Sequence, residues 1–294
     1  MVAPWHEGEV ALQRTIGSDE PLAEIGLKVV RDHLIDQHRA FFPLLPFVVL
    51  GTVDGEGDVW ATLRAGRPGF LSSPDPYRLD LAIPPDLFDP AEAGLKEGEP
   101  AALLGIDLTT RRRNRLNGQV RNRDGRGFSL DVGQSFGNCP KYITLRGPAF
   151  TAEESHEPRE KMTALDAEAR TMIERANTFF VASYAKGWDG NRQVDVSHRG
   201  GEPGFVRVSE EGVLTIPDYS GNRFFNTLGN MAVNPRAGVV FVDFATATLL
   251  QMTGDTELVL DSPEVARFPG AERLWRLRPR RIVRRRGALP LRWR

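Results

Sequence analysis

The chain carries the same Gly-Pro-Gly-Phe pattern twice, at a long interval. Gly66-Arg67-Pro68-Gly69-Phe70 returns as Gly201-Glu202-Pro203-Gly204-Phe205. The flanking matches keep their order, with one inserted residue in the second copy: Val59 with Val194, Arg64 with Arg199, Pro100 with Pro235 and Gly118 with Gly254. An interval of roughly 135 residues is too long for a solenoid repeat or a propeller blade and is the size of one small domain. The sequence therefore predicts an internally duplicated protein of two similar domains.

The domain boundaries follow from this repeat. We expect residues 1–146 to form the first domain and residues 158–294 the second. The segment 147–157, rich in Gly, Pro and Glu, is the predicted linker. The 294 residues suffice for two hydrophobic cores of ordinary size.

The local pattern in each half predicts a helix followed by short strands. Apolar residues recur at helical spacing over 22–34 and 162–176. Aromatic and β-branched runs then predict strands, at 47–53, 59–63, 79–83, 101–108 and 115–120 in the first half and at 179–183, 194–197, 212–216, 237–244 and 249–253 in the second. Many short strands with few helices predict a mainly-β fold with an antiparallel barrel in each half.

Composition narrows the protein class. The net charge of −1 provides no overall field for nucleic acid. No run approaches the ~20 apolar residues of a membrane span, and the N-terminus has no apolar signal segment. The single cysteine, Cys139, excludes an intrachain disulfide and fits a reducing compartment. We therefore expect a cytoplasmic protein without membrane contact.

The most conspicuous polar segments lie in the second half. A predicted strand ends in Ser197, His198 and Arg199 at a Gly-rich turn, and a loop with Gly-Asn-Arg at 221–223 then leads into a short helix. Free N–H groups at a helix N-terminus, together with arginine, bind phosphate well. The alternative is that these are only turn and cap residues. Their joint presence in one repeat favours the phosphate site.

These segments also resemble a known family. Asp-Val-Ser-His-Arg-Gly, Pro-Gly-Phe-Val, Leu-x-Ile-Pro-Asp, Gly-Asn-Arg and Asn-Pro-Arg occur in this order over 178–256, with a weaker ordered match over 41–146. The pattern resembles the pyridoxamine 5′-phosphate oxidase-like flavoproteins. That resemblance implies split β-barrels that bind FMN at a subunit interface. Here the two halves would form an intrachain pseudo-dimer. The residues that would then hold the flavin and its phosphate are Ser197, His198, Arg199, Gly200, Asn222, Arg223, Asn226 and Thr227.

The first half departs from this motif. Ser-His-Arg-Gly becomes Thr62-Leu63-Arg64-Ala65, and the segment 89–94 is acidic where the second half has its Asn-rich helix. Negatively charged side chains repel a phosphate, which is itself an anion. We therefore expect one competent flavin site per chain.

The first half has gained basic residues elsewhere. An Arg/Asn cluster occupies 109–118, where Arg111 and Arg113 could face the flavin or its substrate across the pseudo-twofold. Equally, the cluster could be a charged edge strand that prevents further pairing. Since alternate strand residues face opposite ways, at most half of the cluster points inward. Lys141, in a turn before the last strand of this half, could meet an anionic substrate or reduced flavin.

The resemblance implies an FMN-dependent oxidoreductase with a small-molecule substrate and a hydride donor or electron acceptor, and it leaves room for a homodimer of pseudo-dimers. No catalytic residue is singled out. His198 could tune the flavin or protonate near it, but we favour a simple hydrogen-bonding role. His33 and His38 are not spaced to share a helix face, and no metal is expected. One alternative is a non-catalytic flavin-binding or carrier protein. The other is contact with nucleic acid through the Arg-rich tail at 273–294, which we disfavour against a basic final strand.

Overall fold

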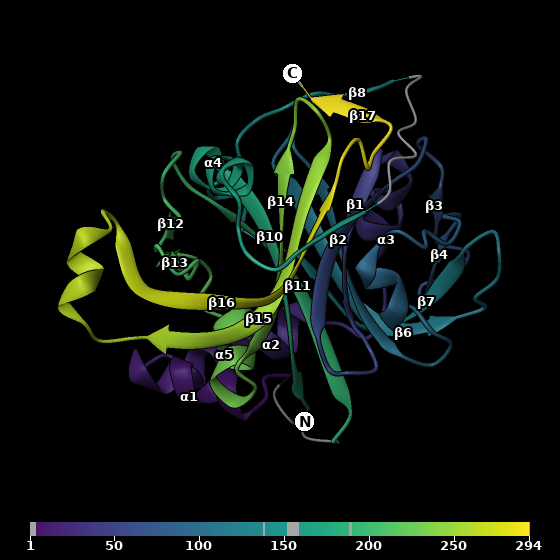
Figure 1. The fold of residues 1–294 in the computed structure, drawn as a ribbon. Coiled ribbons are helices and arrows are strands. Elements are labelled where there is room, and N and C mark those ends of the chain that lie inside the picture. The colour runs from purple at the N-terminus through teal and green to yellow at the C-terminus, as the bar shows by residue number, and fades with distance from the viewer. Residues whose placement is uncertain (1–3, 138, 152–158, 188–189, 294) are drawn as a thin grey trace.

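Two antiparallel sheets with the same strand order make up the molecule (Figure 1). The structure is a computed structural model, and it describes residues 4–137, 139–151, 159–187 and 190–293. The first sheet has the order β2-β1-β5-β6-β7-β4-β3 and the second β11-β10-β14-β15-β16-β13-β12. The mainly-β prediction is confirmed, and each predicted strand overlaps an observed one.

The strands of the first sheet are β1 (Phe47–Val53), β2 (Val59–Ala65), β3 (Leu71–Ser72), β4 (Arg78–Leu81), β5 (Pro100–Asp107), β6 (Arg112–Arg121) and β7 (Phe128–Gly137). Those of the second are β10 (Thr178–Lys186), β11 (Arg192–Gly200), β12 (Arg207–Val208), β13 (Leu214–Tyr219), β14 (Arg236–Asp243), β15 (Thr248–Val259) and β16 (Ala271–Arg285), with β9 (Glu160–Met162) paired to β16. The helices are α1 (Glu7–Thr15), α2 (Asp19–Val29), α3 (Asp36–Arg39), α4 (Ala167–Arg175) and α5 (Asn226–Val233), and the 3₁₀ turns are η1 (Phe42–Leu44), η2 (Pro90–Gly94) and η3 (Pro263–Arg267).

The repeated glycines have the same steric role in both halves. Gly118 and Gly254 each stand at a register shift, in β6 and β15 respectively. A Cβ on Gly118 would lie 2.0 Å from the carbonyl oxygen of Asp131, and one on Gly254 would lie 2.1 Å from that of Arg278. Any side chain there would collide with the neighbouring strand, so both copies of the bulge require glycine.

The two halves pack face to face around a shared core. One apolar cluster fills each sheet's own interior, and a third joins residues of both halves, including Val49, Phe180 and Val196. β11 packs on β5 and β14 packs on β2, which are the same contact with the halves exchanged. A Cβ on Gly51 would lie 3.0 Å from the Cβ of Ala182. The halves thus form a pseudo-dimer within one chain, and its pseudo-twofold offers two interfacial sites.

The structure corrects several expectations. The helix expected over 22–34 ends at Val29, and α1 before it had no predicted counterpart. The second helix begins at Ala167, because Asp166 caps it by accepting a hydrogen bond from Ala169 N at 2.8 Å. Part of the predicted linker forms β8 (Pro148–Phe150), which pairs with β17 (Leu291–Trp293), while 152–158 lie outside the described residues.

The edge-strand interpretation of the Arg/Asn cluster is wrong. Its strand, β6, lies between β5 and β7 and is hydrogen-bonded on both sides. A strand in that place has no free edge to protect. The basic residues of β6 must therefore act through the faces of the sheet.

The Arg-rich tail is mostly a strand of the second sheet. Its arginines pair with carboxylates from several elements: Arg276 with Glu257 and Glu264, Arg281 with Asp54 and Asp58, and Arg284 with Glu160 and Asp166. The tail's charge is thus largely neutralised within the fold, as the strand interpretation requires. None of the described helices has the length and apolarity that crossing a membrane requires.

Candidate functional site at the interface of the two halves

A cavity between the halves brings together the predicted binding residues, apart from Arg111. The first half contributes Arg113, Arg115, Cys139, Lys141 and Tyr142 to its lining. The predicted residues from the second half are Ser197, His198, Arg199, Gly200, Asn222, Arg223, Asn226 and Thr227. Arg111 precedes β6, and its Nε donates to the carbonyl oxygen of Ile143 at 3.1 Å, outside this lining.

The lining has an excess of positive charge. Its basic residues are Arg113, Arg115, Lys141, Arg199, Arg223 and Arg273, whereas its acidic residues are Asp218 and Glu272. Lys141 and Arg223 form no ion pair with any described residue. A cavity of this charge favours an anionic ligand.

Arg115 and Arg113 lie two residues apart on β6 and reach the same cavity. Arg115 is fully buried, and it donates to Asp195 Oδ1 at 2.9 Å and to the hydroxyl of Ser197. Asn117 also donates to Asp195, at 2.8 Å. Asp195 was not among the predicted site residues, although it lies two positions before Ser197 on the same face of β11. This buried cluster ties the two halves together.

Arg113 has no counter-charge. Its guanidinium makes no hydrogen bond or ion pair to the described residues, and its Nε is buried without an acceptor. Burial, and next the nearby Arg115, lower the pKa of Arg113 to about 10, so it stays charged at neutral pH. A buried charge without a partner costs several kcal/mol. Such a charge at a cavity indicates a bound anion.

The N-terminus of α5 is open toward the cavity. Its N-cap residue, Phe225, has a left-handed backbone (φ 62°) and provides no side-chain cap. Arg223, two residues earlier, is also left-handed (φ 62°). Non-glycine residues in this region carry strain that clusters at functional sites. The first N–H groups of α5 are therefore available to a ligand beside Thr227 and Asn226.

Arg199 and His198 line the cavity with unsatisfied nitrogen atoms. Arg199 donates to Asp218 at 2.9 Å through Nη1, but its Nε is buried without an acceptor. His198 Nε2 is likewise buried without a partner among the described residues. Burial, followed by Arg113 and Arg199, holds the pKa of His198 well below its usual 6.5. His198 is thus a neutral imidazole at neutral pH.

Gly200 and the tyrosines shape the cavity wall. A Cβ on Gly200 would lie 2.1 Å from the carbonyl oxygen of Tyr142, so glycine lets the 139–142 segment cross β11. The ring of Tyr142 stacks on Tyr219 with centroids 5.3 Å apart. The Tyr142 hydroxyl also donates to the carbonyl oxygen of Ser220 at 3.1 Å. The 139–142 segment of the first half thus packs over Gly200 and Tyr219 of the second half.

The N-terminal helix α1 supports the site from outside. Gly8 lies against Gly229 of α5, where a Cβ would be 2.2 Å from the backbone oxygen. His6 Nε2 lies 2.8 Å from Asn230 Oδ1, and Asn226 donates to Glu9. Asn230 in turn donates to Asp195 Oδ2 at 3.0 Å. This contact was not predicted, although the His6-x-x-Glu9 spacing of a capping box marks where α1 begins.

Glu9→Gln is expected to weaken the loss of stability that accompanies a rise in pH from about 5 to about 8. Burial, and next the charge of Asp195, raise the pKa of Glu9 to about 8, while Asn226 and Arg115 oppose them. His6, which also faces Glu9, is neutral because burial lowers its pKa. Between about pH 4.5 and about pH 8 the folded chain keeps a proton that the unfolded chain releases, so stability falls as pH rises.

Thermal unfolding at a series of pH values tests this. The Tm of the Glu9→Gln protein should fall less than that of the wild type between about pH 5 and about pH 8. Glu7→Gln, on the exposed side of the same helix, is the matched control and should follow the wild type. Parallel curves for all three proteins would contradict the protonated state of Glu9.

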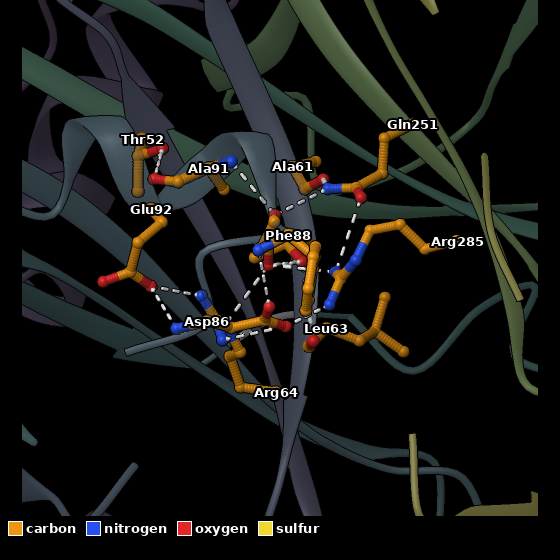
Figure 2. A network of polar contacts seen from close by, with 12 residues as sticks. Thr52, Ala61, Leu63, Arg64, Asp86, Phe88, Ala91, Glu92, Gln251 and Arg285 are labelled. Atoms are coloured by element: carbon orange, nitrogen blue, oxygen red, sulfur yellow. Dashed lines mark hydrogen bonds and ion pairs between the residues drawn. The ribbon is translucent and has the colours of Figure 1, made fainter. Parts of the chain in front are cut away.

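The equivalent place in the first half is occupied by the protein's own carboxylates (Figure 2). Arg64, the counterpart of Arg199, forms ion pairs with Asp86, Asp89 and Glu92. Arg285 also pairs with Asp86 and Asp89. The two interfacial sites thus share the same framework, but the second-half site is a cavity with excess positive charge, whereas the first-half site is filled by carboxylate side chains.

One known family model matches the second half of the chain. Residues 165–286 match the family model described as pyridoxamine 5′-phosphate oxidase. The second half of this chain is therefore similar to that family over this segment. All the second-half residues of the cavity lie within the matched segment of this pyridoxamine 5′-phosphate oxidase-like domain.

Three solved structures with partial similarity each cover less than half of this chain. A Lactobacillus delbrueckii protein assigned as a pyridoxamine 5′-phosphate oxidase is 20% identical, with a TM-score of 0.28, over 36% of this chain and 95% of its own. The FAD-binding protein of Mycobacterium smegmatis is 15% identical, with a TM-score of 0.29, over 42% and 98%. HutZ, the heme storage protein of Vibrio cholerae, is 15% identical, with a TM-score of 0.27, over 40% and 90%. No protein of curated function matches the sequence.

Proposed function

We propose that this cavity binds one FMN per chain and that the protein is a flavin-dependent oxidoreductase acting on a small molecule. The observation that carries the proposal is Arg113, a partly buried side chain at the cavity whose Nε is buried and whose guanidinium has no counter-charge among the described residues. The open N-terminus of α5 and the unpartnered Nε of Arg199 add two further donors for an anion. The cofactor class follows from the family of the second half.

The residues present fit a flavin phosphate. The N–H groups that begin α5, with Ser197, Thr227 and Arg199, would hold the phosphate, since helix N-termini and arginine suit this group. Arg113 and Lys141, from the first half, would supply charge to the rest of the ligand or to an anionic substrate. Both halves are therefore needed for one site.

The chain's own residues bind, orient and exclude water. FMN, when bound, supplies the chemistry of taking up and passing on a hydride. His198 is a neutral imidazole at neutral pH, so its Nε2 can form one hydrogen bond to a ligand, as donor or acceptor according to the tautomer, but it does not act as an imidazolium acid. The stacked rings of Tyr142 and Tyr219 cover one wall and limit access.

A flavin titration tests the proposal. Added FMN should lose its fluorescence on binding and stay with the protein through desalting, at about one flavin per chain. Reduction of the bound flavin by NADH or NADPH, followed by reoxidation in air, would identify an oxidoreductase. A bound flavin that neither nucleotide reduces would favour the carrier alternative, and a protein that takes up no FMN would refute the flavin site.

Arg199→Ala should raise the Kd for FMN about 10- to 100-fold, because a hydrogen bond to a charged group contributes about 1.5–3 kcal/mol. Arg64→Ala, at the equivalent position of the first half, is the matched control and should leave that Kd nearly unchanged. Circular dichroism establishes that both variants are folded before titration. Equal losses of affinity in the two variants would contradict the asymmetry between the halves.

A further inference from the structure

The first half arranges several donors around one carboxylate, that of Asp89. The hydroxyl of Thr62 donates to Asp89 Oδ2 at 2.6 Å, and Arg64 Nε lies 3.2 Å from the same oxygen. The amide of Gln251, from the second half, donates to Oδ1 at 3.0 Å. By the repeat, these residues correspond to Ser197, Arg199 and Arg115 of the cavity described above.

The correspondence extends to the helix that follows. Asp89 precedes η2 and caps it, since its Oδ1 accepts from Ala91 N at 3.0 Å. Phe225 stands at the same place before α5 and leaves that helix uncapped. The carboxylate of Asp89 thus accepts a hydrogen bond from the N-terminus of η2, whereas the N-terminus of α5 has no side-chain acceptor.

The charges in the two places are complementary. Asp89 is fully buried, and burial alone would raise its pKa, but Arg64, Arg285, Thr62 and Gln251 outweigh burial and lower it. Asp89 is therefore an anion. Arg285 lies 3.1 Å from Asp89 Oδ2, and Arg64 forms an ion pair with the same oxygen at 3.2 Å, whereas the charge of Arg113 in the other site has no such partner among the described residues.

We infer that the Asp89 carboxylate is an internal ligand that closes a second anion site, and that an inorganic oxyanion such as phosphate binds there once the carboxylate is removed. Without Asp89, Thr62 Oγ1 and the Ala91 N–H lose their carboxylate acceptor, and Arg64 and Arg285 each lose one of their ion-pair partners around the vacated space. Phosphate presents oxygen acceptors in several directions and carries the charge that the arginines require. This inference goes beyond the flavin proposal and does not depend on it.

Phosphate binding to an Asp89→Ala protein tests the inference. In chloride, the variant should have a lower Tm than the wild type, because two buried guanidinium groups lose a partner. Phosphate at matched ionic strength should restore part of the Tm, by mass action on the folded state. Isothermal titration should count one more phosphate per chain for the variant than for the wild type.

Two controls separate a specific site from general anion effects. Asp54→Ala removes another buried carboxylate, paired with Arg281 and Trp60, and should be destabilised without gaining a phosphate. Adding Arg64→Met to Asp89→Ala should abolish the extra phosphate. The wild-type count reports separately on the second-half cavity, so failure of the flavin proposal would not resemble failure here.

Asp89→Ser provides a second variant that keeps the cap of η2, since serine is a good N-cap residue. It should also bind one extra phosphate. A Ser or Ala variant that folds in phosphate but not in chloride would support the internal ligand. A folded variant that binds no more phosphate than the wild type would overturn it.

Discussion

Replacement of Arg113 by leucine is expected to weaken FMN binding about 10- to 100-fold and, at the same time, to raise the Tm of the flavin-free protein. Arg113 has no partner among the described residues, so the empty protein bears the cost of its burial. Leucine removes that cost and adds apolar burial. The second half carries a fully buried leucine, Leu249 of β15, at the position equivalent to Arg113. Leucine is therefore compatible with this place in the framework.

The opposite signs of the two effects make this prediction specific. Fluorescence titration gives the Kd for FMN, and calorimetry gives the Tm with and without FMN. Arg111→Leu is the matched control, because Arg111 contacts Ile143 outside the cavity lining, and it should leave the Kd nearly unchanged. An Arg113→Leu protein that is less stable but binds FMN normally would make Arg113 structural rather than ligand-binding.

The repeat predicted the fold well because its matching residues occupy positions where the backbone packing permits few other side chains. The paired glycines Gly118 and Gly254 are required at equivalent bulges, and no side chain could replace either. The strand 47–53 was predicted with its observed ends because a hairpin turn and a proline border it. The second-half motif also located the cavity, since Ser197 and Arg199 come from one strand and Thr227 from the next helix.

The contacts between the halves could not be predicted in the same way. Arg115 and Asp195 meet only because β6 crosses the pseudo-twofold to reach β11, and the sequence does not state that geometry. The acidic residues of the first half were expected to repel phosphate. The structure adds that Asp89 is bound by Arg64 and by Arg285, a residue of the other half whose register with η2 no local pattern encodes.

Arg115→Gln is expected to lower the free energy of unfolding by about 3–5 kcal/mol, the cost of leaving one partner of a buried ion pair behind. Arg115 and Asp195 are both buried, at 3% and 6% exposure, and they belong to different halves. After the change, Asp195 keeps only neutral amide donors, from Asn117 and Asn230. Glutamine is the residue at the equivalent position of the second half, Gln251, so its shape suits the framework.

Urea denaturation measures this loss, and two further variants identify its cause. Arg121 lies on β6 like Arg115, and Arg121→Gln breaks its exposed ion pair with Asp131 of β7. This change should cost less than about 1 kcal/mol. Adding Asp195→Asn to Arg115→Gln removes the stranded charge, so the double variant should be more stable than Arg115→Gln alone. If the second change instead added its own full cost, the loss would come from packing, and the ion pair would not be what holds the two halves in register.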